Sequence, residues 1–134
     1  MPVITLEDAI AKAIAEEGQQ TVANQAYFTF LKSSLLMPIE KGSGDEPRVL
    51  FLDSNDHIFL PVFSQKSFLI DWAADSIKQI DIYELSCMEL LAGLGEQVTV
   101  ALNPGTSIYK EFNPDEILKL KTMVSKIQQL VQGD

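Results

Sequence analysis

Apolar and polar residues alternate at helical spacing over two stretches at the start of the chain. The first stretch opens with a Thr-x-x-Asp pattern at Thr5 and Asp8, which is typical of a helix N-terminus. Its apolar positions recur every three or four residues, and Gly18 is where we expect the helix to stop. A second helix is predicted from Val22 to Ser33. Two helices therefore precede any strand.

The end of the chain carries the clearest helical pattern. Asn113 is a favourable N-cap, Pro114 suits the first helical position, and Glu116 completes a capping box. Left in water, the apolar stripe that follows would form a large exposed patch, so we expect it to pack on a sheet. The residues of this stripe are Ile117, Leu120, Val124, Ile127 and Val131.

Between these helices the pattern predicts strands. Arg48–Asp53 and His57–Phe63 flank a Ser-Asn-Asp turn, so we expect these two runs to pair as a hairpin. Pro61 lacks an amide hydrogen, which places it at a strand end, an edge or a bulge. Strict alternation in the last run predicts a half-buried strand. The predicted strands are Leu35–Ile39, Arg48–Asp53, His57–Phe63, Ile77–Ile82 and Gln97–Leu102.

Two further helices are predicted among the strands. Ser64 can cap the first of them, which turns Trp72 and its apolar neighbours to one side. Asp81 and Glu84 match a capping box that would open the second. Cys87 lies on the apolar stripe of this second helix, so we interpret it as a core residue rather than a nucleophile.

These elements together predict a single α+β domain over residues 1–134. We expect a mixed sheet of about five strands, packed by the terminal and central helices. The chain has 134 residues, which is enough for one core but not for two. Hydrophobic residues make up 46% and charged residues 22%, as in ordinary globular proteins.

The charge of the chain narrows the choice of partners. Its 19 acidic and 10 basic residues give a formal net charge of −9, and Arg48 is the only arginine. Nucleic acids and anionic membranes bind clustered basic residues, so neither is expected as a partner. The start of the chain does not resemble a signal peptide, and no apolar run reaches the roughly 20 residues of a membrane helix. We therefore expect a cytoplasmic protein.

Residues suited to catalysis or metal binding are few. His57 is the only histidine, and its nearest acids, Asp53 and Asp56, lie in its own hairpin. The spacing of Asp53, Asn55 and His57 starts like a calcium loop, but the glycine and glutamate that such a loop needs further on are missing. Zinc would need several Cys and His ligands, and the chain has one of each. We expect no metal, no cofactor and no catalytic residues.

The segment Asn103-Pro104-Gly105-Thr106 could form an anion site or a turn. Proline presets the second position of a type II turn, and glycine tolerates the positive φ needed at the third. The Asn103 side chain can bond to the backbone two residues further on. Proline also removes one amide that an anion site would use. We therefore interpret the segment as a structural turn after the last strand.

Several short motifs resemble one known family. Leu60–Ser64 (LPVFS), Trp72 and Leu102–Thr106 (LNPGT) are similar to the N-terminal domain of the enhanced-serine-sensitivity protein family, SseB. Leu35–Pro38 (LLMP) is similar to its first apolar strand. The resemblance covers most of the chain and implies a bacterial α+β domain with no established catalytic residues or cofactor. It implies no binding of serine, because the family name describes a phenotype.

Two functions remain open at this point. The favoured one is a small, cytoplasmic, non-enzymatic protein-interaction module with a protein partner, and such a module could also form a homo-oligomer. Its candidate partner-binding residues are Trp72, Asn103 and Thr106. The alternative is a small-molecule-binding or enzymatic domain that uses His57 and the Asn103–Thr106 loop. A pocket in which His57 faces Asn103 would favour the alternative, and an exposed His57 at a hairpin tip would favour the module.

Overall fold

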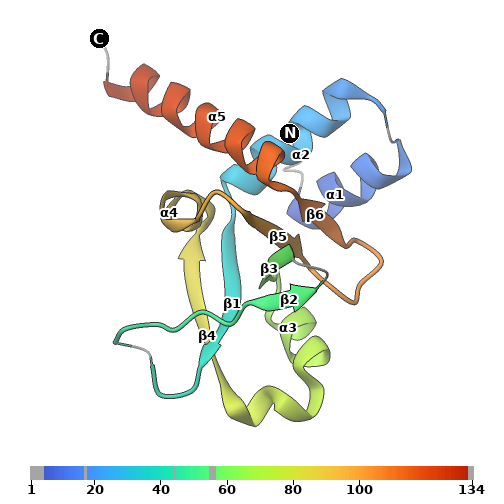
Figure 1. The fold of residues 1–134 in the computed structure, drawn as a ribbon. Helices are drawn as coiled ribbons and strands as arrows, with labels where there is room; N and C mark the ends of the chain where they lie inside the picture. The colour runs from blue at the N-terminus through green and yellow to red at the C-terminus, as the bar shows by residue number, and fades with distance from the viewer. Residues whose placement is uncertain (1–4, 17, 44, 55–56, 133–134) are drawn as a thin grey trace.

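The computed structural model of the chain describes residues 5–16, 18–43, 45–54 and 57–132. Figure 1 shows the arrangement of its elements. The helices are α1 (Leu6–Ala15), α2 (Gln20–Leu31), α3 (Lys66–Ala73), the 3-10 helix η1 (Ala74–Gln79), α4 (Cys87–Gly93) and α5 (Pro114–Gln132). The strands are β1 (Ser34–Glu40), β2 (Leu52–Ser54), β3 (His57–Val62), β4 (Ile80–Ser86), β5 (Val98–Leu102) and β6 (Lys110–Phe112).

The strands form two sheets that touch each other. β2, β3, β5 and β6 form a mixed sheet in this order, in which β3 and β5 are parallel and the other neighbours antiparallel. β1 and β4 form an antiparallel pair. A single bridge from Leu36 to Phe63 joins β1 to the residue that follows β3, and another from Ile39 to Val49 joins it to the segment before β2. The α+β class is confirmed. The described residues hold six strands in two sheets, where we expected about five in one.

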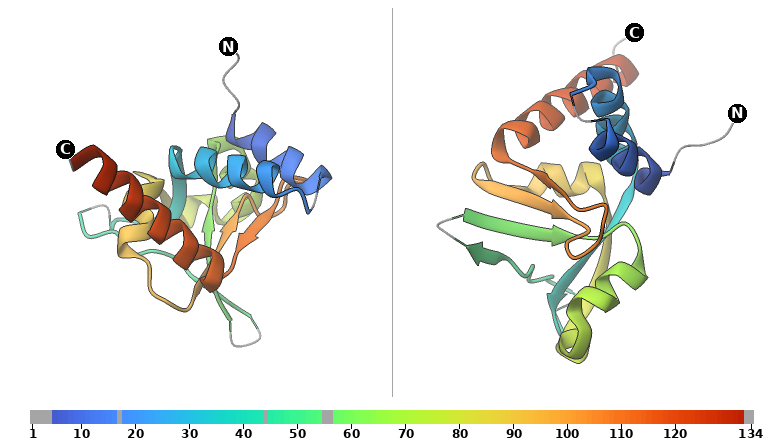
Figure 2. Two further views of the ribbon diagram at one scale, coloured as in Figure 1. Left: turned by 90° about the horizontal axis from the view of Figure 1, so that it is seen from above. Right: turned by 90° about the vertical axis from the view of Figure 1, so that its right-hand side faces the viewer.

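The helices cover the sheets from two ends. α1, α2 and α5 lie at one end of the molecule, at the top of Figure 1, whereas α3 and η1 lie at the other end. The right-hand view of Figure 2 shows the same division from the side. The larger core includes Phe30 and Phe112, whose rings stack with centroids 4.4 Å apart. A smaller core of Phe63, Leu69 and Ala73 lies beside α3.

β5 is buried on both faces. Val98, Val100 and Leu102 belong to the larger core, but Thr99 and Ala101 on the opposite face are also only 6% and 3% exposed. The prediction of a half-buried strand is therefore wrong. β5 is an inner strand between β3 and β6, and other parts of the protein cover both of its faces. The alternation in the sequence reflects the size of the side chains rather than their exposure.

β4 begins later than predicted, and the helix that follows it, α4, also begins later than predicted. The expected strand at Ile77–Ile82 is η1 for its first half. Asp81 and Glu84 lie inside β4, so the capping box predicted for them is wrong. The box that opens α4 belongs to Ser86, whose hydroxyl accepts from the Glu89 amide at 3.1 Å while Glu89 accepts from the Ser86 amide at 3.2 Å. The same sequence pattern occurs twice, and pairing with β1 excludes the first.

The first and last helices begin where predicted. The Thr5 hydroxyl accepts from the Asp8 amide at 3.1 Å. Asn113 Oδ1 accepts from the Glu116 amide at 2.9 Å, and Glu116 Oε1 accepts from the Asn113 amide at 3.3 Å, which completes the predicted box. α2 begins at Gln20, slightly before its predicted start.

The apolar stripe of α5 packs against the protein over its described part. Ile117 and Leu120 are buried in the larger core, and Val124 is half-buried against it. The side chains of Ile127 and Val131, which complete the predicted stripe, lie outside the described residues. Over the described part of the chain, no helix, α5 included, is long and apolar enough to cross a membrane.

The predicted hairpin is confirmed, although its first strand is short. Leu52–Ser54 of β2 pairs with His57–Phe59 of β3. The turn residues Asn55 and Asp56 lie outside the described residues. Pro61 lies in β3 beyond the last residue that pairs with β2, on the way to the end of the strand. Its missing amide therefore costs no bond to β2, as expected for a proline near a strand end.

Candidate functional site

The Asn103–Thr106 segment forms a tight turn directly after β5. The Thr106 amide donates to the Asn103 carbonyl at 3.3 Å, and Gly105 has a φ of +84°. A positive φ at the third position is the mark of a type II turn, so the structural turn is confirmed. The Thr106 hydroxyl donates to the same carbonyl at 2.8 Å and accepts from the Ile108 amide at 3.2 Å. These polar groups are therefore used within the turn.

Asn103 joins this turn to the end of β3. Its side chain is fully buried, with Oδ1 accepting from the Ser64 amide at 2.9 Å and Nδ2 donating to the Ser64 hydroxyl at 3.0 Å. Its own amide donates to the Val62 carbonyl at 2.8 Å. The predicted bond from its side chain to the backbone two residues further on is wrong. Ser64 does not cap α3 either, because the N-cap is Gln65 and forms no side-chain bond.

Trp72 packs on the same turn. A Cβ atom placed on Gly105 would lie 3.8 Å from Trp72 Cδ1, and the Trp72 ring lies 5.4 Å from that of Phe63. The structure thus brings together the three residues predicted for partner binding, Trp72, Asn103 and Thr106. Trp72 and Thr106 are half-buried, whereas Asn103 has no exposed surface. The contacts of Asn103 are therefore made within the protein.

The sequence motifs LPVFS and LNPGT meet at this junction. β3 and β5 are parallel and in register, with Val62 opposite Leu102, so the two motifs end side by side. In open α/β sheets, ligands bind beyond the carboxyl ends of parallel strands. Here the side chains of Ser64 and Asn103 bond to each other, and Trp72 packs beside the turn at Gly105. We interpret the junction as a structural one.

His57 lies away from this junction. It is exposed at the start of β3, whereas Asn103 follows the end of β5. Because Ile58 pairs with Val98 and the strands run parallel, His57 and Asn103 lie at opposite ends of the pair, roughly 20 Å apart at the usual rise of a strand. The structure therefore does not bring them into one pocket, as the enzymatic alternative required. An exposed His57 at a hairpin end is the arrangement expected for the module.

The described residues offer little other reactive chemistry. Within 5–16, 18–43, 45–54 and 57–132, no group of three or more His, Cys, Asp or Glu side chains could hold a metal ion. Cys87 is fully buried, and this burial raises the pKa of its thiol to about 12. A thiol with so high a pKa is a poor nucleophile, because the thiolate is the reactive form. This agrees with the interpretation of Cys87 as a core residue.

A partly buried polar network joins α2, β6 and α5. Glu116 Oε2 accepts from the Tyr27 hydroxyl at 2.8 Å and from Lys110 Nζ at 3.0 Å. Burial raises the pKa of Glu116, but the bonds from Lys110 and Tyr27 outweigh it and hold this pKa below its ordinary value of 4.5. Burial, helped by the bond to Glu116, raises the pKa of Tyr27 to about 12. The network fixes α5 relative to α2.

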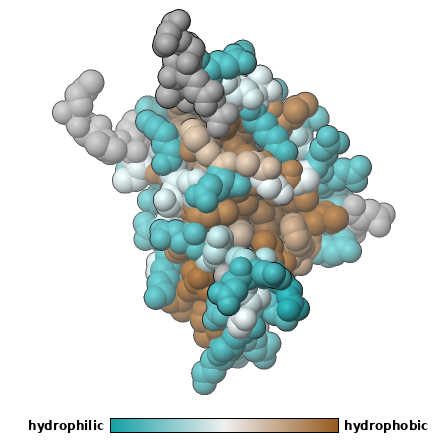
Figure 3. All heavy atoms as spheres, turned by 90° about the vertical axis from the view of Figure 1, so that its left-hand side faces the viewer, coloured by the Kyte–Doolittle hydropathy of each residue, from teal (hydrophilic) through white to brown (hydrophobic). Residues whose placement is uncertain are grey.

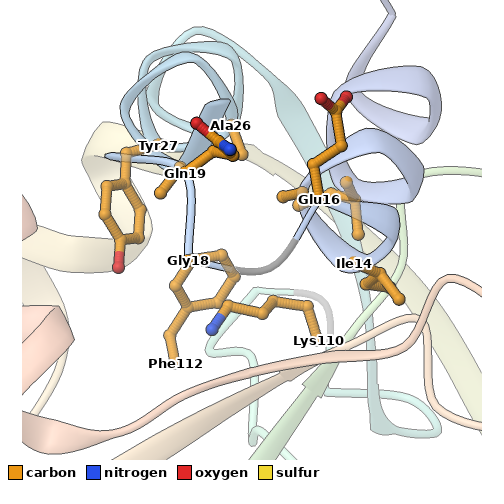
Figure 4. Close-up of a pocket in the computed structure, with 11 residues that line it drawn as sticks. Ile14, Glu16, Gly18, Gln19, Ala26, Tyr27, Lys110 and Phe112 are labelled. Carbon is orange, nitrogen blue, oxygen red and sulfur yellow. The ribbon is translucent and has the colours of Figure 1, made fainter. Parts of the chain in front are cut away.

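Two open grooves lie beside this network, and both are lined by Ala23 and Tyr27. The first, between α1, α2 and β6, has a volume of about 310 Å³. In Figure 4, Lys110 extends along Phe112, and Tyr27 and Ile14 stand on opposite sides of the groove. The second groove lies between α2 and α5 and has a volume of about 510 Å³. We call this second one the α2–α5 groove.

The α2–α5 groove has a neutral wall and a basic wall. Leu118, at its edge, is 64% exposed, the highest value among the large apolar side chains described. The sequence analysis did not predict this surface. The available signal was Leu118, an apolar residue of the predicted helix that does not belong to its apolar stripe. The α2 wall consists of Gln20, Ala23, Asn24 and Tyr27, and the α5 wall of Leu118, Lys119, Thr122, Met123 and Lys126.

Apolar side chains are also exposed near the hairpin. Phe51, Leu52 and Ile58 are 52%, 40% and 42% exposed. Figure 3 shows a broad apolar area on the face of the molecule that lies at the left of Figure 1, with hydrophilic residues around it. The exposed apolar surface is therefore not confined to the α2–α5 groove.

Comparison with known proteins adds one match. A family model described as the SseB protein N-terminal domain matches residues 6–119. The matched region contains every element from α1 to β6 and the first six residues of α5, and so includes the junction of LPVFS and LNPGT. No curated protein and no solved structure matches the chain significantly.

Proposed function

The chain belongs to the SseB protein N-terminal domain family, and we propose that it acts as a small, non-enzymatic protein-interaction module in the bacterial cytoplasm. The observation that carries this proposal is the α2–α5 groove, where the exposed Leu118 stands beside Met123 and the Tyr27 ring. Grooves between helices with apolar linings and polar edges are typical sites for a segment of another protein.

The walls of the groove are held in place without a partner. α2 is anchored in the core by Phe30 and Leu31, and α5 by Ile117 and Leu120. The bond from the Tyr27 hydroxyl to Glu116 ties the two helices directly. A groove formed in advance binds at a lower cost in ordering, which favours affinity.

Two further observations support the proposal, one for the binding role and one for the cytoplasm. The polar groups at the junction of Ser64 and Asn103 bond to each other, so that the most distinctive motif residues serve the fold. Cys87 is a free buried thiol, as is usual for proteins of reducing compartments.

Affinity purification from the native cells tests the function. The bait is compared in three forms: the wild type, Leu118→Asp in the groove and Leu52→Asp at the hairpin. Both leucines are exposed, so neither substitution should unfold the chain. We expect one protein in near-stoichiometric amount with the wild type and with Leu52→Asp, and its loss with Leu118→Asp.

A folded wild-type bait that recovers no protein in near-stoichiometric amount would contradict the proposed function. Loss of the partner with Leu52→Asp but not with Leu118→Asp would keep the function and move the binding surface to the hairpin.

A further inference from the structure

We propose that the α2–α5 groove binds an acidic amphipathic segment of a partner protein, an inference that rests on the proposed function. Its basis is the local charge of the groove. The chain as a whole has a formal net charge of −9, yet the described lining of this groove contains Lys119 and Lys126 and no carboxylate. The groove is thus a basic site on an acidic protein.

The sequence of the two walls explains this charge. α2 has no charged residue from Gln20 to Leu31. In α5, the only acidic residues are Asp115 and Glu116 in the first turn, and every charged residue after them is a lysine. Glu116 is already paired with Lys110. Asp115 does not line the groove, and among the described residues it forms no ion pair with Lys119 or Lys126.

The two lysines are free to meet an outside partner. Among the described residues, ion pairs join Arg48 to Glu40 and Lys110 to Glu116, and neither Lys119 nor Lys126 takes part in one. Both are exposed. A carboxylate approaching the groove would therefore gain a cation without breaking an existing pair.

The spacing of the lysines suits a helical or extended acidic segment. They are two helical turns apart on one face of α5, about 10 Å at 1.5 Å per residue. Thr122 and Met123 lie between them in the groove wall. A segment that places apolar side chains against Met123 and Leu118 would carry its flanking carboxylates to the two ammonium groups. This is the helix-in-groove mode, with charge deciding which segment fits.

Two other occupants fit the groove less well. A nucleic acid would need many more phosphate contacts than two lysines provide, and the remaining acidic surface would repel it. A second copy of this chain carries the same charge of −9 and would be repelled at long range. A partner segment needs only a local acidic stretch, so it is the occupant we infer.

Fluorescence anisotropy with a designed peptide tests the inference. The probe is a fluorescein-labelled peptide of about 14 residues with leucine at positions i, i+3, i+4 and i+7 and glutamate between them. Its partner probe has lysine in place of each glutamate. We expect the full-length chain to bind the acidic probe and not the basic one. Raising NaCl from about 50 to about 300 mM should weaken the binding, because salt screens exposed charges.

Matched charge variants assign the binding to the groove. Lys119→Glu/Lys126→Glu should raise the Kd of the acidic probe by about tenfold or more. The control Lys66→Glu/Lys78→Glu changes the net charge equally, on exposed positions of α3 and η1 at the other end of the molecule. We expect this control to change the Kd less than about twofold, since the charges lie well beyond a Debye length of about 10 Å.

Several results would overturn the inference. They are equal binding of the acidic and basic probes, no binding of the acidic probe, and equal weakening by the two charge variants. Equal affinity for a single-stranded RNA of the same charge would indicate a general polyanion site. A dimer in sedimentation experiments that only Lys119→Glu/Lys126→Glu abolishes would replace the partner segment by a second copy.

The same variants separate this inference from the proposed function. If Lys119→Glu/Lys126→Glu, used as the bait, recovers as much of the cellular partner as the wild type does, the inference of an acidic segment is wrong. The proposed interaction module is then unaffected. If the wild type recovers no partner while the acidic probe binds as expected, the groove chemistry stands and the proposed function fails.

Discussion

Among the single residues, Asn103 is the most constrained polar one. It is fully buried, adopts a φ of +55°, and uses both ends of its amide on Ser64. Asparagine tolerates this left-handed backbone better than most residues. The sequence marks Asn103 as a turn residue but does not reveal Ser64 as its partner, because 39 positions separate the two. Only the parallel pairing of β3 and β5 brings them together.

Replacing Asn103 with Ala should destabilise the chain by about 2–4 kcal/mol. The partly buried Ser64 amide and hydroxyl would lose their partner, and the new residue would be strained at positive φ. The free energy of unfolding in urea measures the effect. Ser107→Ala, an exposed position of the same loop, is the control and should be nearly silent. Equal stability of the two variants would show that the bonds to Ser64 contribute little.

Gly105→Val should cost about 1–3 kcal/mol, chiefly through backbone strain at its positive φ. A Cβ atom there has room, because its nearest heavy atom, Trp72 Cδ1, would be 3.8 Å away. Gly93→Ala is the control, since its backbone has no positive φ and its Cβ would meet nothing within 4 Å. Urea unfolding compares the two. A Gly105→Val chain as stable as the control would contradict the assignment of a type II turn.

Glu116 should make the stability of the folded chain depend on pH in the acidic range. Its pKa is held below its ordinary value of 4.5 in the folded chain, so its contribution is complete above that value and is lost as the pH falls through the folded pKa. We expect the urea midpoint of the wild type to exceed that of Glu116→Gln at pH 7 and the gap to narrow on acidification. Asp115→Gln, an exposed neighbour, is the control. A gap that is constant with pH would contradict the role of the ionised carboxylate.

Among the elements, local patterns locate helices better than strands. The caps at Thr5 and Asn113 are predicted correctly because they use residues three positions apart. The same pattern at Asp81 fails, because β4 pairs with β1 over that stretch, and this pairing depends on residues far away in the sequence. β5 shows the same limit, since a strand's cover on its second face cannot be read from its own residues.

α5 offers a direct test of docking. Val124 is half-buried against the larger core, whereas the adjacent Ser125 is exposed. Val124→Asp should therefore destabilise by about 1–3 kcal/mol, because it places a charge against apolar neighbours. Ser125→Asp adds the same charge and should change the stability by less than about 0.5 kcal/mol. Thermal unfolding measures both. Equal melting temperatures would show that this part of α5 is not docked.

At the scale of the whole molecule, the two ends of the sheets have different roles. Around α3, the motifs LPVFS and LNPGT are used to hold the chain together. Around α2 and α5, the fold leaves an open groove with a basic wall. Sequence analysis pointed to the first end, because its residues are distinctive. The groove at the second end forms because α2 and α5, which are far apart in the sequence, diverge in space. Its charge could have been predicted, because every charged residue of α5 after Glu116 is a lysine.

Cys87 reports on the integrity of the whole fold. It is fully buried, and burial raises the pKa of its thiol to about 12. We expect a disulfide reagent at pH 8 to modify the native chain very slowly and the unfolded chain at once. The urea midpoint for labelling should coincide with that for loss of circular dichroism. Rapid labelling of the native chain would show that α4 opens locally.

Site-specific photo-crosslinking in the native cells tests the interaction module most directly. A benzophenone amino acid is placed at Leu118, in the α2–α5 groove, or at Leu52, at the hairpin, in otherwise identical chains. We expect one discrete protein adduct from position 118, none from position 52, and loss of the adduct when Lys119 and Lys126 are replaced by Glu. Adducts from neither position in a folded chain would contradict the interaction module, and adducts from position 52 alone would contradict the α2–α5 groove as its binding surface.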